Sequence, residues 1–441
     1  MTLPCYPSYN DSGVQWLGEM PGHWEVKTLK RLAKLTTGMT PPTDDAENYA
    51  DDEQLQWIRP DDLDETGAPT TATKFLSEKG WAQARQIKAG ATLICCIGTI
   101  GKLGFIAEDA STNQQLTAAE FERSNRYFFF AMCAGRTPFE VASTGNVLRI
   151  LNTERLGNIP FPCPSEVEAT QIASFLDRET AKIDELVAEQ RRLMALLKEK
   201  RQAVISHAVT RGVNPDAPLK PSGIEWLGDV PAHWEVIALK RIADVQTGVA
   251  KGKDHGTRET ITVPYLRVAN VQDGYLNLET VATMEIPACD LVRYTLKHGD
   301  VLMNEGGDFD KLGRGCIWES QIDPCITQNH VFAVRPKLVS SAWLNVITSS
   351  DFAQFYFMTR SKQSTNLASI SSTNLMELPV VLPPVQEQQA ILAFVTSQTD
   401  SFDTLTTEAQ HAIDLLQERR TALISAAVTG KIDVRNAVAS D

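Results

Sequence analysis

The chain has 441 residues, of which 43% are hydrophobic and 22% are charged, and its formal net charge at pH 7 is −13. This length exceeds what one hydrophobic core usually organises, so we expect more than one domain of ordinary globular composition. The negative balance argues against general affinity for nucleic acid, so any DNA contact must come from local patches or be helped by a partner.

Membrane and disulfide-rich classes also fit poorly. No apolar run approaches the ~20 residues that a membrane span needs, and the first residues lack the basic and apolar regions of a secretory signal. The eight cysteines include no Cys-x-x-Cys pair. We therefore expect reduced, buried thiols in a cytoplasmic protein rather than a disulfide or zinc framework.

Two globular blocks are predicted, at residues 1–164 (block one) and 213–383 (block two), because motifs of the first recur in the second. The segment Pro21–Val26, which reads Pro-Gly-His-Trp-Glu-Val, returns as Pro231–Val236, which reads Pro-Ala-His-Trp-Glu-Val. Thr37-Gly38 likewise returns as Thr247-Gly248. A repeat of this length indicates a duplicated domain rather than a solenoid.

Each block mixes strand and helix patterns. Alternating apolar and polar residues predict strands at Gln56–Arg59 and Tyr265–Asn270, and apolar stretches predict helices at Tyr127–Ala134 and Trp343–Thr359. The fold class expected is therefore α+β, with two similar domains. The matched ends and diverged middles of the blocks indicate a common scaffold that presents two different surfaces.

A long helix is predicted after each block, at residues 165–212 and 384–430, and residues 431–441 form a C-terminal tail. Ser165 and Glu168 form a capping box that begins the first helix, and Gly212 ends it. Apolar residues at three- and four-residue steps give each helix one seam, and the two seams are expected to bury each other as a coiled coil. The predicted helix-pairing residues are Ile172, Leu176, Ile183, Leu186, Leu193, Leu197 and Val204 in the first helix, and Ile391, Phe402, Leu405, Leu416 and Leu423 in the second.

Signatures of catalysis are missing from the sequence. It contains no complete nucleotide-binding loop, no H-E-x-x-H helix and no Cys/His cluster at metal spacing. We therefore predict no catalytic residue, no cofactor and no metal site. His23 and His233 recur at equivalent positions beside a tryptophan, which favours a scaffold role over a catalytic one.

Polar loop residues are the remaining candidates for function. Lys and Arg in glycine-containing loops can contact phosphates, and Arg, Asn and Gln can hydrogen-bond base edges in the major groove. Solvated loops and turn-closing Asn residues are the alternative interpretation. The predicted DNA-binding residues are Arg59, Lys102, Asn113, Gln114, Asn146 and Arg149 in block one, and Lys251, Lys253, Arg258, Arg267, Asn270, Lys311, Arg314, Gln328, Asn329 and Asn366 in block two.

The order of these parts resembles the specificity subunit of type I restriction-modification systems. The Pro-x-His-Trp-Glu-Val segments resemble the entries to its two target-recognition domains, and Tyr265–Gly274 is similar to a segment common in those domains. Ile159–Pro162 and Leu378–Pro383, each leading into a Glu/Gln-rich helix, resemble the starts of its two spacer helices. The resemblance covers nearly the whole chain, and it rests on the order of all parts in both halves.

This resemblance implies a non-catalytic subunit that reads a bipartite, asymmetric target in double-stranded DNA. Each block would read one half-site, and the two helices would pair antiparallel and fix the unread gap. The partners implied are two modification (methyltransferase) subunits and restriction (nuclease/translocase) subunits. A coiled-coil adaptor with two protein-binding domains explains the helices and the charge equally well, but not why the loops diverge between common ends.

Overall fold

The computed structural model describes residues 4–51, 55–145, 148–252, 256–307, 312–313, 315–364 and 367–437. The chain divides into two compact units. The first unit combines Met1–Arg191 with Ala409–Asp441, and the second comprises Arg192–Glu408. Each unit therefore holds one block together with parts of both long helices, α5 (Glu166–Arg211) and α10 (Val385–Val428). The domain boundaries expected from the sequence stay predictions.

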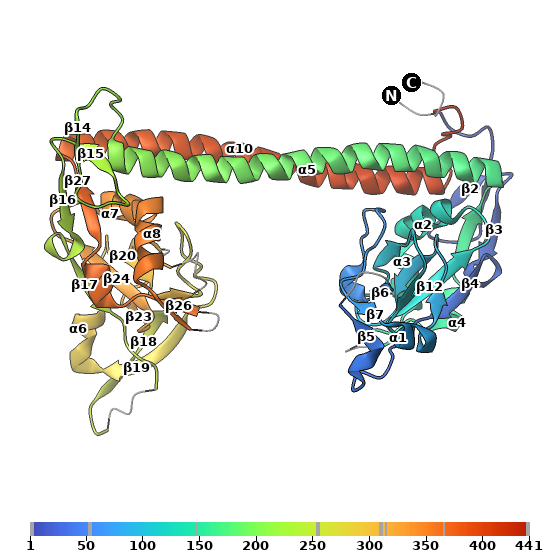
Figure 1. Cartoon of the computed structure of the whole chain (residues 1–441), viewed down its shortest axis with the longest axis horizontal. Helices are drawn as coiled ribbons and strands as arrows, with labels where there is room; N and C mark the ends of the chain where they lie inside the picture. Colours follow the sequence, from blue (N-terminus) through green and yellow to red (C-terminus); the bar gives the residue numbers. More distant parts are fainter. Residues whose placement is uncertain are drawn as a thin grey trace. The chain divides into compact units, whose positions relative to one another are not determined.

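Block one is a mixed α+β fold. Its main sheet has four strands in the order β10-β9-β12-β4, and a second sheet has the order β6-β11-β8. Helix α2 packs against the strands β9 and β10 of the main sheet, in the part of the chain coloured blue to cyan in Figure 1. The strands are β1 (Tyr9–Asp11), β2 (Glu19–Pro21), β3 (Glu25–Thr28), β4 (Ala33–Thr37), β5 (Tyr49–Ala50), β6 (Trp57–Ile58), β7 (Phe75–Leu76), β8 (Gln86–Ile87), β9 (Thr92–Cys95), β10 (Leu103–Phe105), β11 (Ala110–Thr112), β12 (Leu116–Phe121) and β13 (Pro160–Cys163); the helices are α1 (Glu78–Gln83), α2 (Asn125–Ala134), α3 (Arg136–Ala142) and α4 (Thr153–Gly157).

Block two repeats this plan. Its main sheet has the order β17-β24-β20-β22, the counterpart of β4-β12-β9-β10, and its β16-β27 pair is the counterpart of β3-β13. A sheet β19-β18-β23 and a small sheet β21-β26-β25 complete it. The strands are β14 (Leu219–Pro221), β15 (Asp229–Pro231), β16 (Glu235–Ala238), β17 (Ala243–Thr247), β18 (Thr260–Leu266), β19 (Ala282–Pro287), β20 (Val301–Asn304), β21 (Gly306–Gly307), β22 (Gly315–Ile317), β23 (Ile326–Thr327), β24 (Val331–Pro336), β25 (Lys362–Ser364), β26 (Leu367–Ser369) and β27 (Pro379–Leu382); the helices are α6 (Leu291–Tyr294), α7 (Ser341–Thr348), α8 (Asp351–Arg360) and α9 (Ser372–Met376).

Two element predictions needed correction. The single helix expected at Trp343–Thr359 is two helices, α7 and α8, because Ser349 ends the first and Ser350 has the extended backbone of an N-cap, with ψ 157°. The strand expected at Tyr265–Asn270 ends at Leu266, and the next residues form a turn in which the Arg267 amide donates to Asn270 Oδ1. Polar side chains that bond the local backbone end both elements.

The long helices run antiparallel within each unit. In the first unit Arg420 of α10 donates to Asp184 of α5 at 3.0 Å, and in the second unit Arg201 of α5 pairs with Asp403 of α10. Residue numbers therefore increase along α5 in the direction in which they decrease along α10. The hydrophobic core of the first unit includes Ile172 and Val428 from the two helices, so the helix ends are part of the core rather than attached to it.

Burial along the two predicted seams is uneven. Ile172, Leu176, Ile183, Leu197, Ile391 and Phe402 are buried. Val204, Leu416 and Leu423 are half-buried. Leu186, Leu193 and Leu405, however, are 44, 41 and 42% exposed, whereas Val187 and Ile413 are 7 and 3% exposed. The seam therefore passes through Val187 rather than its neighbour Leu186, because helix geometry and not side-chain size decides which position faces the partner.

In each unit the repeated Pro-x-His-Trp segment contacts the start of one long helix and the end of the other. His23 Nε2 lies 3.0 Å from Glu168 in the first turn of α5, and His233 Nε2 lies 2.7 Å from Glu387 in the first turn of α10. Trp24 packs against Gly430, just after α10, and Trp234 packs against Gly212, just after α5. Both histidines thus have the scaffold role that the sequence predicts.

Candidate nucleic-acid interface

Candidate residues of each block follow two parallel strands and therefore lie at the same edge of a sheet. In block one β6 pairs in parallel with β11, Ile58 lying opposite Thr112, so Arg59 and Asn113 follow these strands at the same edge. In block two β18 pairs in parallel with β23, Leu266 lying opposite Thr327. Arg267 and Gln328 consequently follow at an equivalent edge. We call these positions and the loops around them the reading edge of each block.

The Thr-Gly turns close the reading edges. An ideal Cβ on Gly38 would lie 2.3 Å from the Asn113 carbonyl oxygen, and one on Gly248 would lie 2.2 Å from the Gln328 carbonyl oxygen. Only glycine allows this approach, which explains why Thr-Gly recurs in both blocks. We call the segment that carries Lys251, Lys253 and Arg258 the basic loop. The loop that begins at Gly248 continues to Lys251, which is exposed, so the basic loop starts beside the reading edge of block two.

In block one the structure separates exposed candidates from residues that hold the fold. Gln114 and Arg149 are exposed, and Thr40 donates to Gln114 Oε1. Lys102 donates to the Pro60 carbonyl at 2.8 Å. Asn113 is 9% exposed, and its amide donates to Gln115 Oε1 at 2.9 Å. We therefore assign Lys102 and Asn113 to the fold and retain Gln114 and Arg149 as candidates.

Arg59 is partly exposed, like the retained candidates, and is also hydrogen-bonded within the fold. Its side chain is 29% exposed, and one of its nitrogens donates to Thr73 Oγ1 at 3.0 Å. Asp62 accepts from its backbone amide at 2.8 Å. The contact with Thr73 holds the guanidinium in place and uses one of its five donors.

In block two the same separation applies. Asn270 is 3% exposed, and its amide donates to the carbonyl oxygens of Asn277 and Thr280 at 2.9 and 3.0 Å, so it closes a loop. Lys251 and Arg258 are exposed, and Arg267, Gln328 and Asn329 are half-buried at the reading edge. The remaining candidates lie outside the described residues; they are Asn146 of block one and Lys253, Lys311, Arg314 and Asn366 of block two.

Two further residues at the reading edge of block two were not predicted from the sequence. Glu305 follows β20 and His330 precedes β24, and the register that places Asn304 opposite Val331 brings them together. His330 Nδ1 lies 3.0 Å from Glu305 Oε2. They are far apart in the sequence, so only the pairing of β20 with β24 could have revealed this contact.

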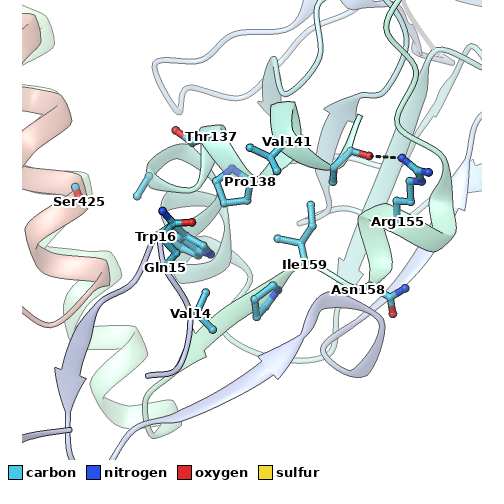
Figure 2. A pocket seen from close by; sticks show the side chains of 13 residues that line it. Val14, Gln15, Trp16, Thr137, Pro138, Val141, Arg155, Asn158, Ile159 and Ser425 are labelled. Atoms are coloured by element: carbon cyan, nitrogen blue, oxygen red, sulfur yellow. Dashed lines mark hydrogen bonds between the residues drawn. The ribbon is translucent and has the colours of Figure 1, made fainter. Parts of the chain in front are cut away.

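A pocket of about 940 Å3 lies in the first unit, lined by the Val14–Trp16 loop, α3, the segment from Arg155 to Pro160 and Ser425 of α10. Figure 2 shows Trp16 beside Pro138, with Arg155 and Asn158 on the opposite side. In the second unit the rings of Phe352, Phe355 and Tyr356 lie 6.2, 5.8 and 5.9 Å from that of Trp226, the counterpart of Trp16. Smaller side chains on α3 thus leave open the volume that these rings fill.

Potential metal ligands do not cluster in the described part of the chain. Within it, no group of three or more His, Cys, Asp or Glu could hold a metal ion. Burial raises the pKa of the Cys96 thiol to about 11, and it raises the pKa values of the Cys316 and Cys325 thiols to about 12. Such thiols are protonated and unreactive near neutral pH. In the same part of the chain, no helix is both long and apolar enough to cross a membrane.

Comparison with known proteins agrees with this architecture. The type I restriction modification DNA specificity domain matches residues 21–192 and 231–414. The StySPI specificity subunit of Salmonella potsdam is 23% identical over 428 residues, which cover 94% of this chain and 90% of that protein. The EcoKI specificity subunit of Escherichia coli (strain K12) is 22% identical over 442 residues, with 94% and 90% coverage.

A solved structure has the same fold. A chain from a study of complex assembly and conformational transition in a type I R-M system superimposes with a TM-score of 0.67 at 14% identity. The match covers 93% of this chain and 98% of that one. With most of its length matched in two segments, one for each block, the chain belongs to the family of type I restriction-modification DNA specificity subunits.

Proposed function

We propose that this chain is the sequence-reading subunit of a type I restriction-modification complex and has no catalytic activity of its own. Block one and block two would each read one half of a bipartite, asymmetric target, and the paired helices would fix the unread gap. The observation that carries the proposal is the pair of equivalent reading edges, which share a scaffold but present different side chains. Two half-sites of different sequence present different donors and acceptors in the major groove. Two blocks with a common backbone and different polar side chains can therefore read them.

The proposed roles of the partner subunits are the reactions of the complex and most of the contact with the DNA backbone. Two modification subunits would supply the methyl-transfer chemistry, and restriction subunits would supply cleavage and translocation, all in the cytoplasm. The net charge of −13 leaves much of the DNA-backbone contact to these partners. Base contacts at the reading edges would then add specificity rather than bulk affinity.

Neutralising the basic loop of block two is expected to weaken DNA binding by the complex with the modification subunits. In a variant with Lys251, Lys253 and Arg258 all changed to Gln, each lost phosphate contact should reduce the slope of log affinity against log salt by about 0.9. The measurement is DNA affinity over a series of salt concentrations, for the complex and not for the isolated chain.

The matched control changes Arg241, Lys297 and Lys337 to Gln. Arg241 precedes β17, Lys297 precedes β20 and Lys337 follows β24, so the variant removes the same charge at the strand ends that lie away from the reading edge. The control should keep the salt slope of the original protein. Equal slopes for all three proteins would contradict a role of the basic loop in DNA binding and would agree with the adaptor interpretation.

A further inference from the structure

Three side chains at the reading edge of block two form a continuous hydrogen-bonded chain. His330 Nδ1 lies 3.0 Å from Glu305 Oε2, and Asn329 Nδ2 lies 3.3 Å from His330 Nε2. The side chain of Glu305 is 26% exposed and that of His330 is 58% exposed. The Glu305–His330–Asn329 chain therefore links a partly covered carboxylate, through an exposed imidazole, to a half-buried amide.

The donors and acceptors in this chain have a fixed order. A carboxylate can only accept, so Nδ1 of His330 carries the proton and donates it to Glu305. The other nitrogen of the neutral ring, Nε2, then accepts a hydrogen bond from the Asn329 amide. One hydrogen of Asn329 Nδ2 is thereby used. Its second hydrogen and its side-chain carbonyl oxygen have no hydrogen-bond partner among the described residues.

The backbone holds these three residues at the reading edge. The Glu305 amide donates to the His330 carbonyl at 2.9 Å, and the Asn329 amide donates to the Val249 carbonyl at 3.0 Å, next to the basic loop. Asn329 also follows β23, which pairs in parallel with β18, so it lies at the same edge as Arg267. Its position is set by main-chain contacts with two neighbouring segments, and its side-chain orientation is set by His330.

Block one has the same backbone pattern but lacks these hydrogen-bonded side chains. There the Cys96 amide donates to the Gln115 carbonyl at 2.8 Å, so Cys96 and Gln115 occupy the positions of Glu305 and His330. Gln115 bonds the buried Asn113 instead, at 2.9 Å. Gln114, the counterpart of Asn329, is an acceptor for Thr40. The scaffold does not require the Glu–His–Asn arrangement, which makes a role specific to block two the better explanation.

We propose that Asn329 reads an adenine in the half-site of block two, and that Glu305 and His330 are positioning residues that fix the orientation of its amide. This inference rests on the proposed function. Adenine presents an N6 amino donor and an N7 acceptor in the major groove. The free carbonyl oxygen of Asn329 matches the donor, and the remaining Nδ2 hydrogen matches the acceptor. Guanine offers acceptors at both positions and leaves that carbonyl oxygen without a donor.

The variant E305Q tests the positioning role. The Gln amide can either accept from Nδ1 of His330 or donate to it, so the ring proton is no longer fixed on Nδ1 and the Asn329 amide is no longer held in one orientation. We expect discrimination between adenine and the other bases to fall roughly tenfold to a hundredfold at one position of one half-site. The measurement is methylation of a target library with every position varied, by the complex with the modification subunit. E319Q, which removes a negative charge from an exposed side chain of the same block, is the matched control and should keep all preferences.

The variant N329D tests the base assignment independently. A carboxylate accepts hydrogen bonds but does not donate them, and it pairs with the N4 amino group of cytosine. We therefore expect N329D to exchange adenine for cytosine at the position that E305Q relaxes. The other half-site, read by block one, serves as an internal check that each variant is folded and active.

Three results would overturn the inference. One is wild-type discrimination in both E305Q and N329D, and another is equal relaxation in E305Q and E319Q. The third is an N329D effect at a position that does not hold adenine. If the original complex methylates a bipartite motif, these results refute only the role of Asn329. If the original complex methylates no motif at all, the proposed function and this inference fail together.

Discussion

Inserting four residues into each long helix, after Arg191 in α5 and after Glu408 in α10, is expected to widen the gap between the half-sites and to leave both half-sites unchanged. Four residues add about 6 Å of helix, and one base pair occupies about 3.4 Å along DNA. The gap should therefore grow by one to two base pairs. Both insertions lie at the residues where the chain divides into the two compact units, so neither block is altered.

Methylation at the original spacing should fall roughly a hundredfold or more, because one half-site is lost and each mismatched base pair costs about 1–3 kcal/mol. Sequencing the methylated positions in cells that carry the variant measures both effects. An insertion in α5 alone is the control, and it should lower stability by shifting buried seam residues such as Val187 against an unchanged α10. An unchanged gap in the double insertion would refute the role of the helices as a ruler.

The substitution Gly430→Ala is expected to lower the free energy of unfolding by about 2–5 kcal/mol. Gly430 has φ +72°, which costs an L-residue about 1–2 kcal/mol. A Cβ there would also lie 2.2 Å from Pro21 Cδ and 3.2 Å from Trp24, and such overpacking typically costs 1–3 kcal/mol more. The new methyl group would push the end of α10 away from block one.

Gly13→Ala provides the matched control. Gly13 has φ +67° but no atom within 4 Å of an ideal Cβ, so it isolates the backbone strain. Its loss of stability should stay near about 1–2 kcal/mol. Unfolding in denaturant, followed for the transition of the first unit, measures both variants. Equal losses would show that the contact between Pro21, Trp24 and the end of α10 contributes little to stability.

Much of the fold followed from repetition in the sequence. The recurrence of Pro-x-His-Trp predicted two related blocks, and local apolar spacing predicted both long helices, because these signals depend only on neighbouring residues. The exact seam could not be predicted as well. Leu186 and Val187 both fit a helical stripe, and only the packing of the helices shows that Val187 is the buried one.

The reading edges were harder to predict because strand pairing creates them. Arg59 with Asn113, and Arg267 with Gln328, were candidates by residue type, and the parallel pairs β6-β11 and β18-β23 bring them together. Residue type alone could not show that Asn270 is used by the fold, and it gave no reason to consider Glu305 and His330. Their contact depends on the register of β20 with β24.

The most direct test of the proposed function is to express the chain with a cognate modification subunit in a host without DNA methylation and to map the methylated positions genome-wide. The proposal predicts one bipartite, asymmetric motif that disappears when this chain is omitted. Unmethylated DNA, despite a stable and stoichiometric complex that binds the methyl donor, would contradict it and would favour an adaptor with no nucleic-acid role.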